Sequence, residues 1–255
     1  EYERELSLTG GRMSKYYLKE DQDFRLDTED LRDALADDID FLILCNPNNP
    51  TSSALTQDEL RSLAILCKER NIFIMIDETY VEFAPSVEEI TAVPLVSEYD
   101  NLMILRGVSK FFAAPGLRLG YGVTSNRQFL DELKRHQNPW SLNSIGAYAG
   151  ELMLRDADYI SRTRQLILTE RDRCLASLKE FRYAKAYPAY GNFILVKICK
   201  DDVSSFGVFE HAVKQGMMIR DCSSFEGLPG EYVRFCIMNP EDNTRLLDCM
   251  AELLA

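Results

Sequence analysis

The sequence predicts an α/β protein whose main sheet is mostly parallel, and three observations support this prediction. Apolar runs at residues 41–45, 72–76 and 102–105 lack polar alternation, which is typical of strands covered on both faces. A helical segment at residues 56–70 separates the first two runs, so that strands and helices alternate along the chain. Each run leads into a polar segment, and the carboxyl edge of an open α/β sheet is where ligands bind.

The other elements are predicted from capping residues, chain breakers and apolar runs. Residues 12–25 are expected to form a short strand and a loop. The expected helices are residues 1–8, 27–36, 56–70, 126–135, 143–154, 157–179, 204–215 and a last one that opens at Asn239. The expected strands of a second sheet are residues 183–187, 193–199, 217–220 and 231–238.

The two long helical stretches near the middle of the chain suggest a connection between domains. We therefore expect a large domain at residues 1–155 and a smaller C-terminal α/β domain at residues 156–255. With 255 residues and 46% apolar content, the chain can bury a large core in this arrangement.

Composition argues against several classes of protein. The net charge is −12 and no block of lysine or arginine is present, which argues against a role on nucleic acid or at a membrane surface. No apolar run approaches the roughly 20 residues that a membrane-spanning helix needs, and no signal-peptide pattern opens the chain. The seven cysteines are scattered without CxxC spacing, which indicates buried thiols in a reducing cytosol. Two histidines are too few for a histidine metal centre or a serine protease triad, and no metal site is expected.

The segment from residue 101 to residue 123 holds the first chemical motif. Lys110 lies just past a buried strand, where partial burial would lower the pKa of its amine and let it form a Schiff base. Ser109 precedes it, and Arg118 follows eight residues later within Pro-Gly-Leu-Arg-Leu-Gly-Tyr. Taken alone, Lys110 would be read as a solvated loop lysine. Its neighbours favour the functional interpretation.

Two polar segments upstream end the other buried strands. Asn49 lies in Asn-Pro-Asn-Asn-Pro-Thr, a rigid loop because its prolines exclude a continued strand or helix. Asp77 stands at the end of the next apolar run, and Tyr80 follows three residues later. A carboxylate in that place is costly unless it meets a cation. Each segment alone is also compatible with a plain turn or with helix capping.

Together these segments resemble the cofactor-binding segments of pyridoxal-phosphate enzymes of the aspartate-aminotransferase fold, known as fold type I, and the resemblance covers essentially the whole chain. It implies that Lys110 holds pyridoxal 5'-phosphate through its amine and that Arg118 grips the cofactor phosphate. The family often has Ser or Thr where this chain has Gly107. One phosphate hydrogen bond must then come from Ser109, from the backbone, or not at all; such a bond contributes on the order of 1 kcal/mol.

The resemblance also assigns the residues around the cofactor ring. Asp77 would keep the pyridine nitrogen protonated, so that the ring acts as an electron sink. Asn49 and Tyr80 would both reach its phenolic oxygen. The chain opens without a methionine or a recognisable first strand, so it is expected to begin inside the large domain. The segment missing by this comparison would hold a Gly-rich phosphate loop and an aromatic residue that stacks on the ring.

Three residues of the C-terminal half resemble substrate-binding residues of this family. Arg234 lies in an otherwise apolar strand, where a guanidinium needs a carboxylate or phosphate partner. Its context implies a contact with the substrate α-carboxylate, and a structural salt bridge is the alternative. Asn192, in Gly-Asn-Phe, resembles the family's Ala-Asn-Phe near that carboxylate. Arg220 opens Arg-Asp-Cys-Ser-Ser-Phe-Glu-Gly-Leu, which is similar to a segment that supplies an arginine for the phosphorylated substrate of threonine-phosphate decarboxylases.

The resemblance therefore favours an enzyme that decarboxylates a phosphorylated amino acid, with histidinol-phosphate aminotransferases as the second branch. In either branch, the bond that breaks is the one held perpendicular to the cofactor ring. An upright carboxylate leaves as carbon dioxide, whereas an upright α-hydrogen is removed by Lys110 and transamination follows. A hypothesis of another class is a catalytically inert fragment or remnant. Family members are usually homodimers with sites at the subunit interface, so a homodimer is expected by resemblance.

Overall fold

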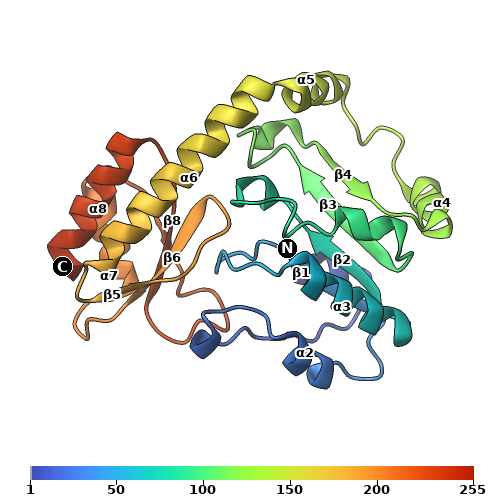
Figure 1. The fold of residues 1–255 in the computed structure, drawn as a ribbon, viewed down its shortest axis with the longest axis horizontal. Helices are drawn as coiled ribbons and strands as arrows, with labels where there is room; N and C mark the ends of the chain where they lie inside the picture. Colours follow the sequence, from blue (N-terminus) through green and yellow to red (C-terminus); the bar gives the residue numbers. More distant parts are fainter. Residues whose placement is uncertain (1) are drawn as a thin grey trace.

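The computed structural model describes residues 2–255 and contains two four-stranded sheets (Figure 1). The first sheet has the order β1-β2-β3-β4, in which the first three strands are parallel and β4 is antiparallel at one edge. Its strands are β1 (Phe41–Cys45), β2 (Phe73–Asp77), β3 (Leu102–Gly107) and β4 (Gly120–Val123). The mostly parallel main sheet is confirmed, and the three buried runs lie within two residues of their predicted limits.

The second sheet is wholly antiparallel, in the order β5-β6-β8-β7. Its strands are β5 (Ala184–Ala186), β6 (Phe193–Ile198), β7 (Arg220–Asp221) and β8 (Tyr232–Cys236). All four coincide in part with predicted strands. The strand predicted at residues 217–220 is mostly wrong, because only Arg220 and Asp221 pair with β8.

The helices begin where polar side chains accept hydrogen bonds from their first turns. Asp27, Asn126 and Asn239 each cap a helix in this way, and Thr56 with Glu59 forms the capping box. The helices are α1 (Tyr2–Leu8), α2 (Thr28–Ala34), α3 (Gln57–Glu69), α4 (Arg127–His136), α5 (Ser144–Arg155), α6 (Ala157–Lys179), α7 (Ser205–Lys214) and α8 (Pro240–Leu254). The prediction of a helix at residues 1–8 is confirmed from Tyr2 onward, and Glu1 lies outside the described residues.

The segment at residues 12–25 contradicts its prediction, because it forms no strand and only one short 3-10 turn, Glu20–Gln22. Its contacts are made by side chains. The Phe24 ring packs edge-on against Tyr187, with centroids 5.0 Å apart, and Glu20 accepts hydrogen bonds from Lys197 at 2.8 Å. The segment is therefore held against the second sheet by its side chains, without joining a ladder.

The core of the first half lies on one face of its sheet. Leu60 and Leu63 of α3 pack with Ile74, Ile76 and Ile104, all of them fully buried. The alternate residues of the same strands are only partly buried, so the burial of β2 and β3 alternates. The expectation that both faces are covered is therefore wrong for the described residues. Apolar side chains on the second face were mistaken for a fully buried strand.

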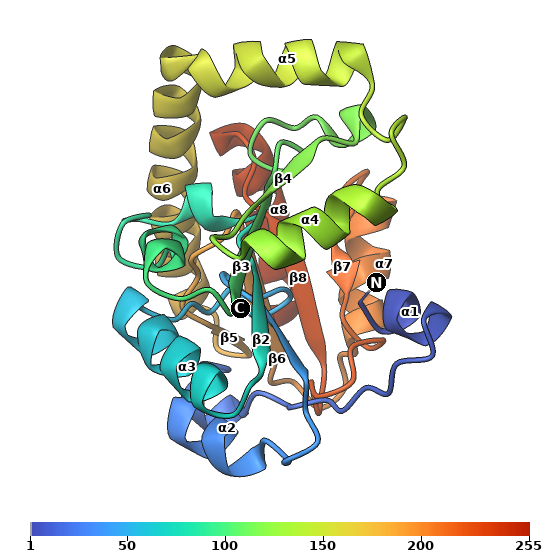
Figure 2. The ribbon, with the colours of Figure 1, turned by 90° about the vertical axis from the view of Figure 1, so that its right-hand side faces the viewer.

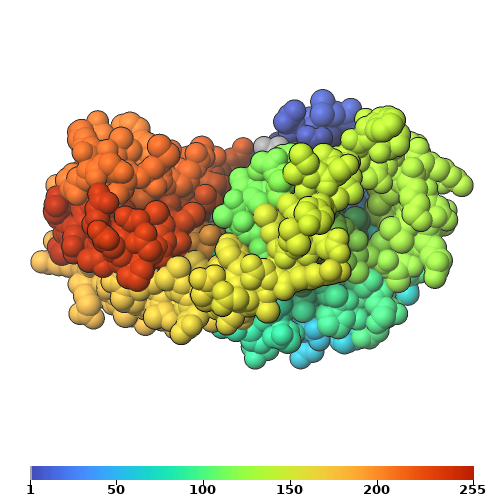
Figure 3. All heavy atoms as spheres, turned by 90° about the horizontal axis from the view of Figure 1, so that it is seen from above, coloured from blue at the N-terminus to red at the C-terminus, as the bar shows by residue number. Residues whose placement is uncertain are grey.

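Helix α6 lies between the two sheets and begins directly after α5 (Figure 1). Figure 2 shows α5 lying across one end of the molecule, with α6 running away from it along one side. In the space-filling view the C-terminal part and the first-sheet part form two lobes, and α6 crosses between them (Figure 3). The predicted domain boundary falls at this junction and stays a prediction. Packing crosses it, because Phe83 and Phe111 belong to the core cluster of the second sheet.

No helix among residues 2–255 is both long enough and apolar enough to span a membrane.

Candidate active site

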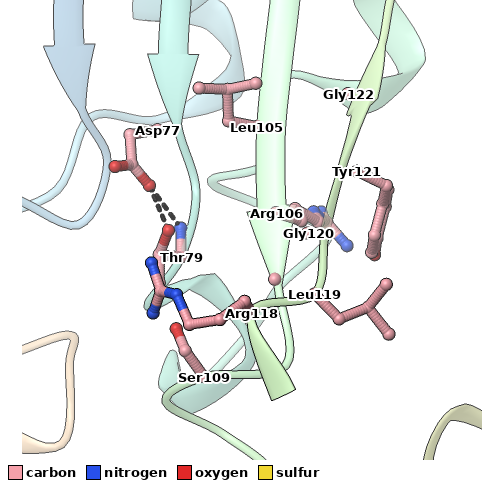
Figure 4. A pocket seen from close by; sticks show the side chains of 11 residues that line it. Asp77, Thr79, Leu105, Arg106, Ser109, Arg118, Leu119, Gly120, Tyr121 and Gly122 are labelled. Atoms are coloured by element: carbon pink, nitrogen blue, oxygen red, sulfur yellow. Dashed lines mark hydrogen bonds between the residues drawn. The ribbon is translucent and has the colours of Figure 1, made fainter. Parts of the chain in front are cut away.

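A cavity of about 430 Å³ opens at the carboxyl ends of β2 and β3. Asp77, Ser109 and Arg118 are among its lining residues, so three of the predicted cofactor residues share one hollow. Figure 4 shows Asp77, Thr79, Arg118 and Ser109 following one another along one side of it. The carboxyl edge predicted from the sequence is therefore where these groups meet.

Asp77 is held by neutral donors on both carboxylate oxygens. Its Oδ1 accepts from the Thr79 backbone N–H at 2.9 Å and from the Thr79 hydroxyl. Its Oδ2 accepts from the hydroxyl of Tyr2, the first residue of α1. Burial and the Asp77 carboxylate together raise the pKa of Tyr2, so Tyr2 stays a donor. The carboxylate is thus fixed in place, with its oxygens directed into the cavity region.

Lys110 lies in the turn that follows β3, one residue after Ser109 of the cavity wall. Its Nζ lies 5.7 Å from the ring centroid of Tyr80. The side chain is exposed, so the expected partial burial is not found. The physical reason is local: the turn projects from the end of the strand, whereas the strand residues before it are inside the sheet.

The wall opposite Asp77 is built by a close approach of β3 and β4. A Cβ at Gly120 would lie 3.0 Å from the Arg106 carbonyl oxygen, and one at Gly107 would lie 3.2 Å from the Leu119 carbonyl oxygen. Glycine at position 107 therefore suits this tight crossing. Arg118 adopts a left-handed backbone, φ +52, and its Nη1 donates to the Pro115 carbonyl at 3.1 Å.

A second group of predicted residues surrounds Phe193, at the start of β6. The Tyr80 ring packs edge-on against Phe193, with centroids 5.0 Å apart. The Arg234 guanidinium lies over the same ring, 5.0 Å from its centroid, and its Nη1 donates to Asn49 Oδ1. Arg234 Nε is buried and has no hydrogen-bond partner among residues 2–255. This guanidinium thus keeps a directed donor for a further acceptor.

Arg220 lies opposite Arg234 on the neighbouring strand, in register within the β7–β8 pair. Its Nη2 donates to Ser224 Oγ at 2.7 Å, and the guanidinium lies 5.5 Å from the Phe225 ring centroid. Neither arginine forms an ion pair with a carboxylate of the described chain, although the sequence holds 41 acidic residues. The salt-bridge alternative for Arg234 is therefore not supported. Asn192 is half-buried, and its Oδ1 has no partner among the described residues.

The structure therefore divides the predicted residues into two neighbouring groups. Asp77, Ser109 and Arg118 share the cavity, while Lys110, Tyr80, Asn49 and Arg234 follow one another around Phe193. Sequence reasoning missed Thr79 and Tyr2 as partners of Asp77. Thr79 could have been found, since an aspartate side chain commonly accepts a hydrogen bond from the backbone N–H two residues later. Tyr2 carries no local signal, because it is 75 positions away.

The model of the family "Aminotransferase class I and II" matches residues 1–249 of this chain, which therefore belongs to that family of enzymes. The threonine-phosphate decarboxylase of Salmonella typhimurium is 32% identical over 254 residues, which cover 100% of this chain and 68% of the relative. The histidinol-phosphate aminotransferase of Clostridium acetobutylicum has a solved structure with a TM-score of 0.92 and 30% identity, covering 99% of this chain and 74% of that one. The predicted aspartate-aminotransferase-like fold is thus confirmed.

A second solved structure shares the fold. It is the histidinol-phosphate aminotransferase of Sinorhizobium meliloti in complex with pyridoxal-5'-phosphate, with a TM-score of 0.86 and 21% identity, covering 98% of this chain and 66% of that one. At that identity it shows the fold alone.

The residues of this chain fit pyridoxal phosphate on their own chemistry. In Figure 4 the acid Asp77 lies at one end of the cavity, where it suits a basic ring nitrogen. The hydroxyl of Ser109 and the guanidinium of Arg118 lie at the other end, where they suit a phosphate. The donor left open on Arg234 and the acceptor left open on Asn192 lie in the neighbouring group. Buried polar atoms without partners are rare in folded proteins, so these two suit a small polar ligand.

Proposed function

We propose that this protein is a pyridoxal-phosphate enzyme that acts on a phosphorylated amino acid, and that its reaction is the decarboxylation of O-phospho-L-threonine. The observation that carries the proposal is the pair Arg220 and Arg234, which lie in register on adjacent strands without a carboxylate partner in the described chain. Two neighbouring guanidiniums suit a substrate that carries both a carboxylate and a phosphate. The similarity to the Salmonella decarboxylase supports the same substrate class.

In this proposal the cofactor is held by residues from three strand ends. Ser109 and Arg118 would bind its phosphate, Lys110 would hold it through the amine, and Asp77 would pair with the ring nitrogen. Asn49 and Tyr80 would serve the phenolic oxygen. When bound, pyridoxal phosphate supplies an electron sink for the carbanion that bond cleavage leaves.

The protein side chains would then orient the substrate and manage its protons. The bond from Arg234 Nη1 to Asn49 fixes the guanidinium plane, and Arg234 Nε keeps an unused donor, so Arg234 can bind the α-carboxylate. Arg220 would bind the phosphate, assisted by Ser224. The Lys110 amine, on its turn beside Tyr80, is the group available to move a proton at the α-carbon.

Histidinol-phosphate aminotransferase activity is the second candidate, because the Clostridium structure is similar over 99% of this chain. Both substrates carry a phosphate, so Arg220 serves either one. They differ at the α-carbon, since histidinol phosphate has no α-carboxylate for Arg234 to bind. In the aminotransferase reaction Arg234 would bind the α-carboxylate of the co-substrate 2-oxoglutarate, whereas in the decarboxylation it would bind the carboxylate that leaves.

The test uses purified protein supplied with pyridoxal phosphate. One sample receives O-phospho-L-threonine, and a second receives histidinol phosphate with 2-oxoglutarate. We expect carbon dioxide release in the first sample without consumption of a keto acid. Glutamate formation in the second sample, with no carbon dioxide in the first, would overturn the decarboxylase assignment in favour of the transaminase. Absence of both products, with no visible cofactor absorbance, would favour a catalytically inert fragment or remnant.

The variant Arg220→Gln tests whether Arg220 binds the substrate phosphate. Loss of one charge-assisted contact of about 1.5–3 kcal/mol corresponds to a roughly 10- to 150-fold rise in KM for O-phospho-L-threonine. The KM for L-threonine, which lacks the phosphate, should change little. An equal effect on both compounds would remove the phosphate role of Arg220.

We also propose a homodimer in the cytosol, with residues 1–155 and 156–255 as its two domains per chain. Helix α5 supports the dimer, because Ile145, Tyr148 and Leu152 are exposed along it and Trp140 is exposed in the preceding turn. Contiguous apolar side chains of this kind mark interaction surfaces. Sedimentation velocity should give a dimer, and Ile145→Glu with Tyr148→Glu should shift it to monomer. A wild-type monomer would contradict the proposal.

A further inference from the structure

The junction between the two sheets holds a buried arginine that the proposed chemistry does not use. Arg171 lies on α6 with 2% of its surface exposed, and no carboxylate of residues 2–255 forms an ion pair with it. Burying a charge without acceptors is costly, so its hydrogen bonds define what it does. Its Nη1 donates to the carbonyl oxygen of Phe83 at 3.0 Å and to that of Gly191 at 3.1 Å.

Both carbonyls adjoin residues of the candidate site. Phe83 ends the 3-10 turn Val81–Phe83, which directly follows Tyr80. Gly191 directly precedes Asn192, whose Oδ1 is buried without a partner in the described chain. One guanidinium nitrogen therefore links the segment that carries the cofactor residues to the segment that carries a substrate residue.

The Gly191 segment is also held from its other side. Ser52 Oγ accepts from the Gly191 N–H at 2.8 Å and from the Tyr190 N–H at 3.2 Å. Ser52 is fully buried with φ +62, and its own N–H donates to the Asn48 carbonyl at 2.8 Å, next to Asn49. We call the contacts of Ser52 and Arg171 with the Gly191 backbone the clamp. A Cβ at Gly191 would lie 3.2 Å from Ser52 Oγ, so the clamp leaves little space. The backbone before Asn192 is thus fixed between the Asn49 loop and Arg171.

We propose that Arg171 is a positioning residue that sets the place of Asn192 relative to Tyr80 and Asn49, and so determines how the substrate is held. The inference rests on the proposed function for its substrate. Asn192 directly precedes β6. Its backbone is held by the clamp and by the hydrogen bond that its carbonyl oxygen accepts from the Ile237 N–H. Without the Arg171 bond, the loop before β6 gains freedom, whereas the cavity residues Asp77 and Arg118 keep their own hydrogen bonds.

The test compares two conservative variants on one helix. Arg164 lies seven residues earlier on α6 and donates to the carbonyl oxygens of Glu82, Ala84 at 3.1 Å and Pro85 at 3.2 Å. Arg164 therefore holds the same loop as Arg171, residues 82–85, but it makes no hydrogen bond to Gly191 among those described. Arg171→Lys is therefore matched by Arg164→Lys. A lysine side chain is shorter than an arginine side chain, so its ammonium does not reach the position of Nη1, which donates to both carbonyls in Arg171. Arg171→Met covers the case in which a lysine still reaches one carbonyl.

Three experiments are done on each protein: steady-state kinetics with O-phospho-L-threonine for KM and kcat, an absorbance titration with pyridoxal phosphate, and hydrogen exchange of the peptide that contains residues 190–193. For Arg171→Lys we expect KM to rise about 10-fold or more, since small misplacement of a substrate group is costly. We expect faster exchange in that peptide and an unchanged cofactor titration. Arg164→Lys should leave KM within about twofold.

Two results would overturn the inference. One is unchanged exchange at residues 190–193 in both Arg171 variants, because the clamp would then not depend on the arginine. The other is an equal rise in KM for Arg164→Lys and Arg171→Lys, which would make the effect one of general loop anchoring. If the wild-type protein neither binds nor converts the substrate, the proposed function fails, while the exchange comparison still tests the link to Arg171.

Discussion

Glu78 and Arg106 form a buried ion pair next to the candidate site. Glu78 is fully buried, and Arg106 is 17% exposed in its side chain. Glu78 Oε2 accepts from Arg106 Nε at 3.0 Å and Nη2 at 2.7 Å, and from Thr91 Oγ1 at 2.8 Å; its Oε1 accepts from the Ala92 N–H at 2.6 Å. Glu78 directly follows β2 and Arg106 lies near the end of β3, so the pair joins the ends of these two strands.

The perturbation is Arg106→Met. Breaking a buried pair by removing one partner costs about 3–5 kcal/mol, because the remaining charge is left uncompensated. Burial raises the pKa of Glu78, and the Arg106 charge opposes that rise. The variant should raise the pKa of Glu78 further. An acid whose folded pKa lies above its unfolded value binds a proton more tightly when folded, so stability falls as pH rises through that window.

The assay is urea denaturation of Arg106→Met and wild type at pH 5 and pH 8. We expect a loss of about 3–5 kcal/mol at pH 8 and a smaller loss at pH 5, where Glu78 can take up a proton. Arg32→Met is the matched control, because its ion pair with Glu29 is exposed on α2 and should contribute about 1 kcal/mol or less. A loss below about 1 kcal/mol, or an equal loss at both pH values, would show that Arg106 does not compensate a buried charge on Glu78.

Two further predictions concern the phosphate end of the cavity and the helix α6. Arg118→Met should weaken pyridoxal-phosphate binding about 10-fold or more in an absorbance titration, since one charge-assisted contact is lost; unchanged affinity would remove Arg118 from the phosphate site. Glu170 is buried, and the hydrogen bonds that it accepts from Arg173 hold the pKa of its carboxyl group below the usual range. The ionised carboxylate therefore stabilises the folded protein above pH about 4.3, and this contribution is lost as the pH falls through the lower pKa of the folded state. Glu170→Gln should therefore lower the unfolding free energy by about 1–3 kcal/mol at pH 7, and the deficit should shrink toward pH 3; a deficit that grows on acidification would contradict this.

The main sheet and its ligand edge were predictable from the sequence because their signals are local. A short apolar run followed by a polar loop marks a strand end, and parallel strands bring such ends together. The capping residues were equally readable: Thr56 with Glu59, and Asn126, define helix starts by short-range hydrogen bonds. Asp77, Ser109 and Arg118 could thus be assigned to one edge before their geometry was known.

The contacts that escaped prediction are long-range or depend on what covers a surface. Tyr2 reaches Asp77, and Glu20 reaches Lys197, across 75 and 177 positions, and neither pairing leaves a local pattern. The exposure of Lys110 and the open second face of the first sheet depend on tertiary coverage, which apolar content does not report. Arg171 carries no motif at all, and only its buried bonds to two loops reveal it.

The proposed function requires that Lys110 binds pyridoxal phosphate through its amine. This is measured directly by reducing the cofactor-loaded protein with borohydride and mapping its peptides by mass spectrometry. We expect the cofactor mass on the peptide that contains Lys110, and we expect Lys110→Ala to carry no label and to show no turnover. Label spread evenly over other lysines, or a Lys110→Ala protein that converts substrate as fast as the wild type, would contradict it.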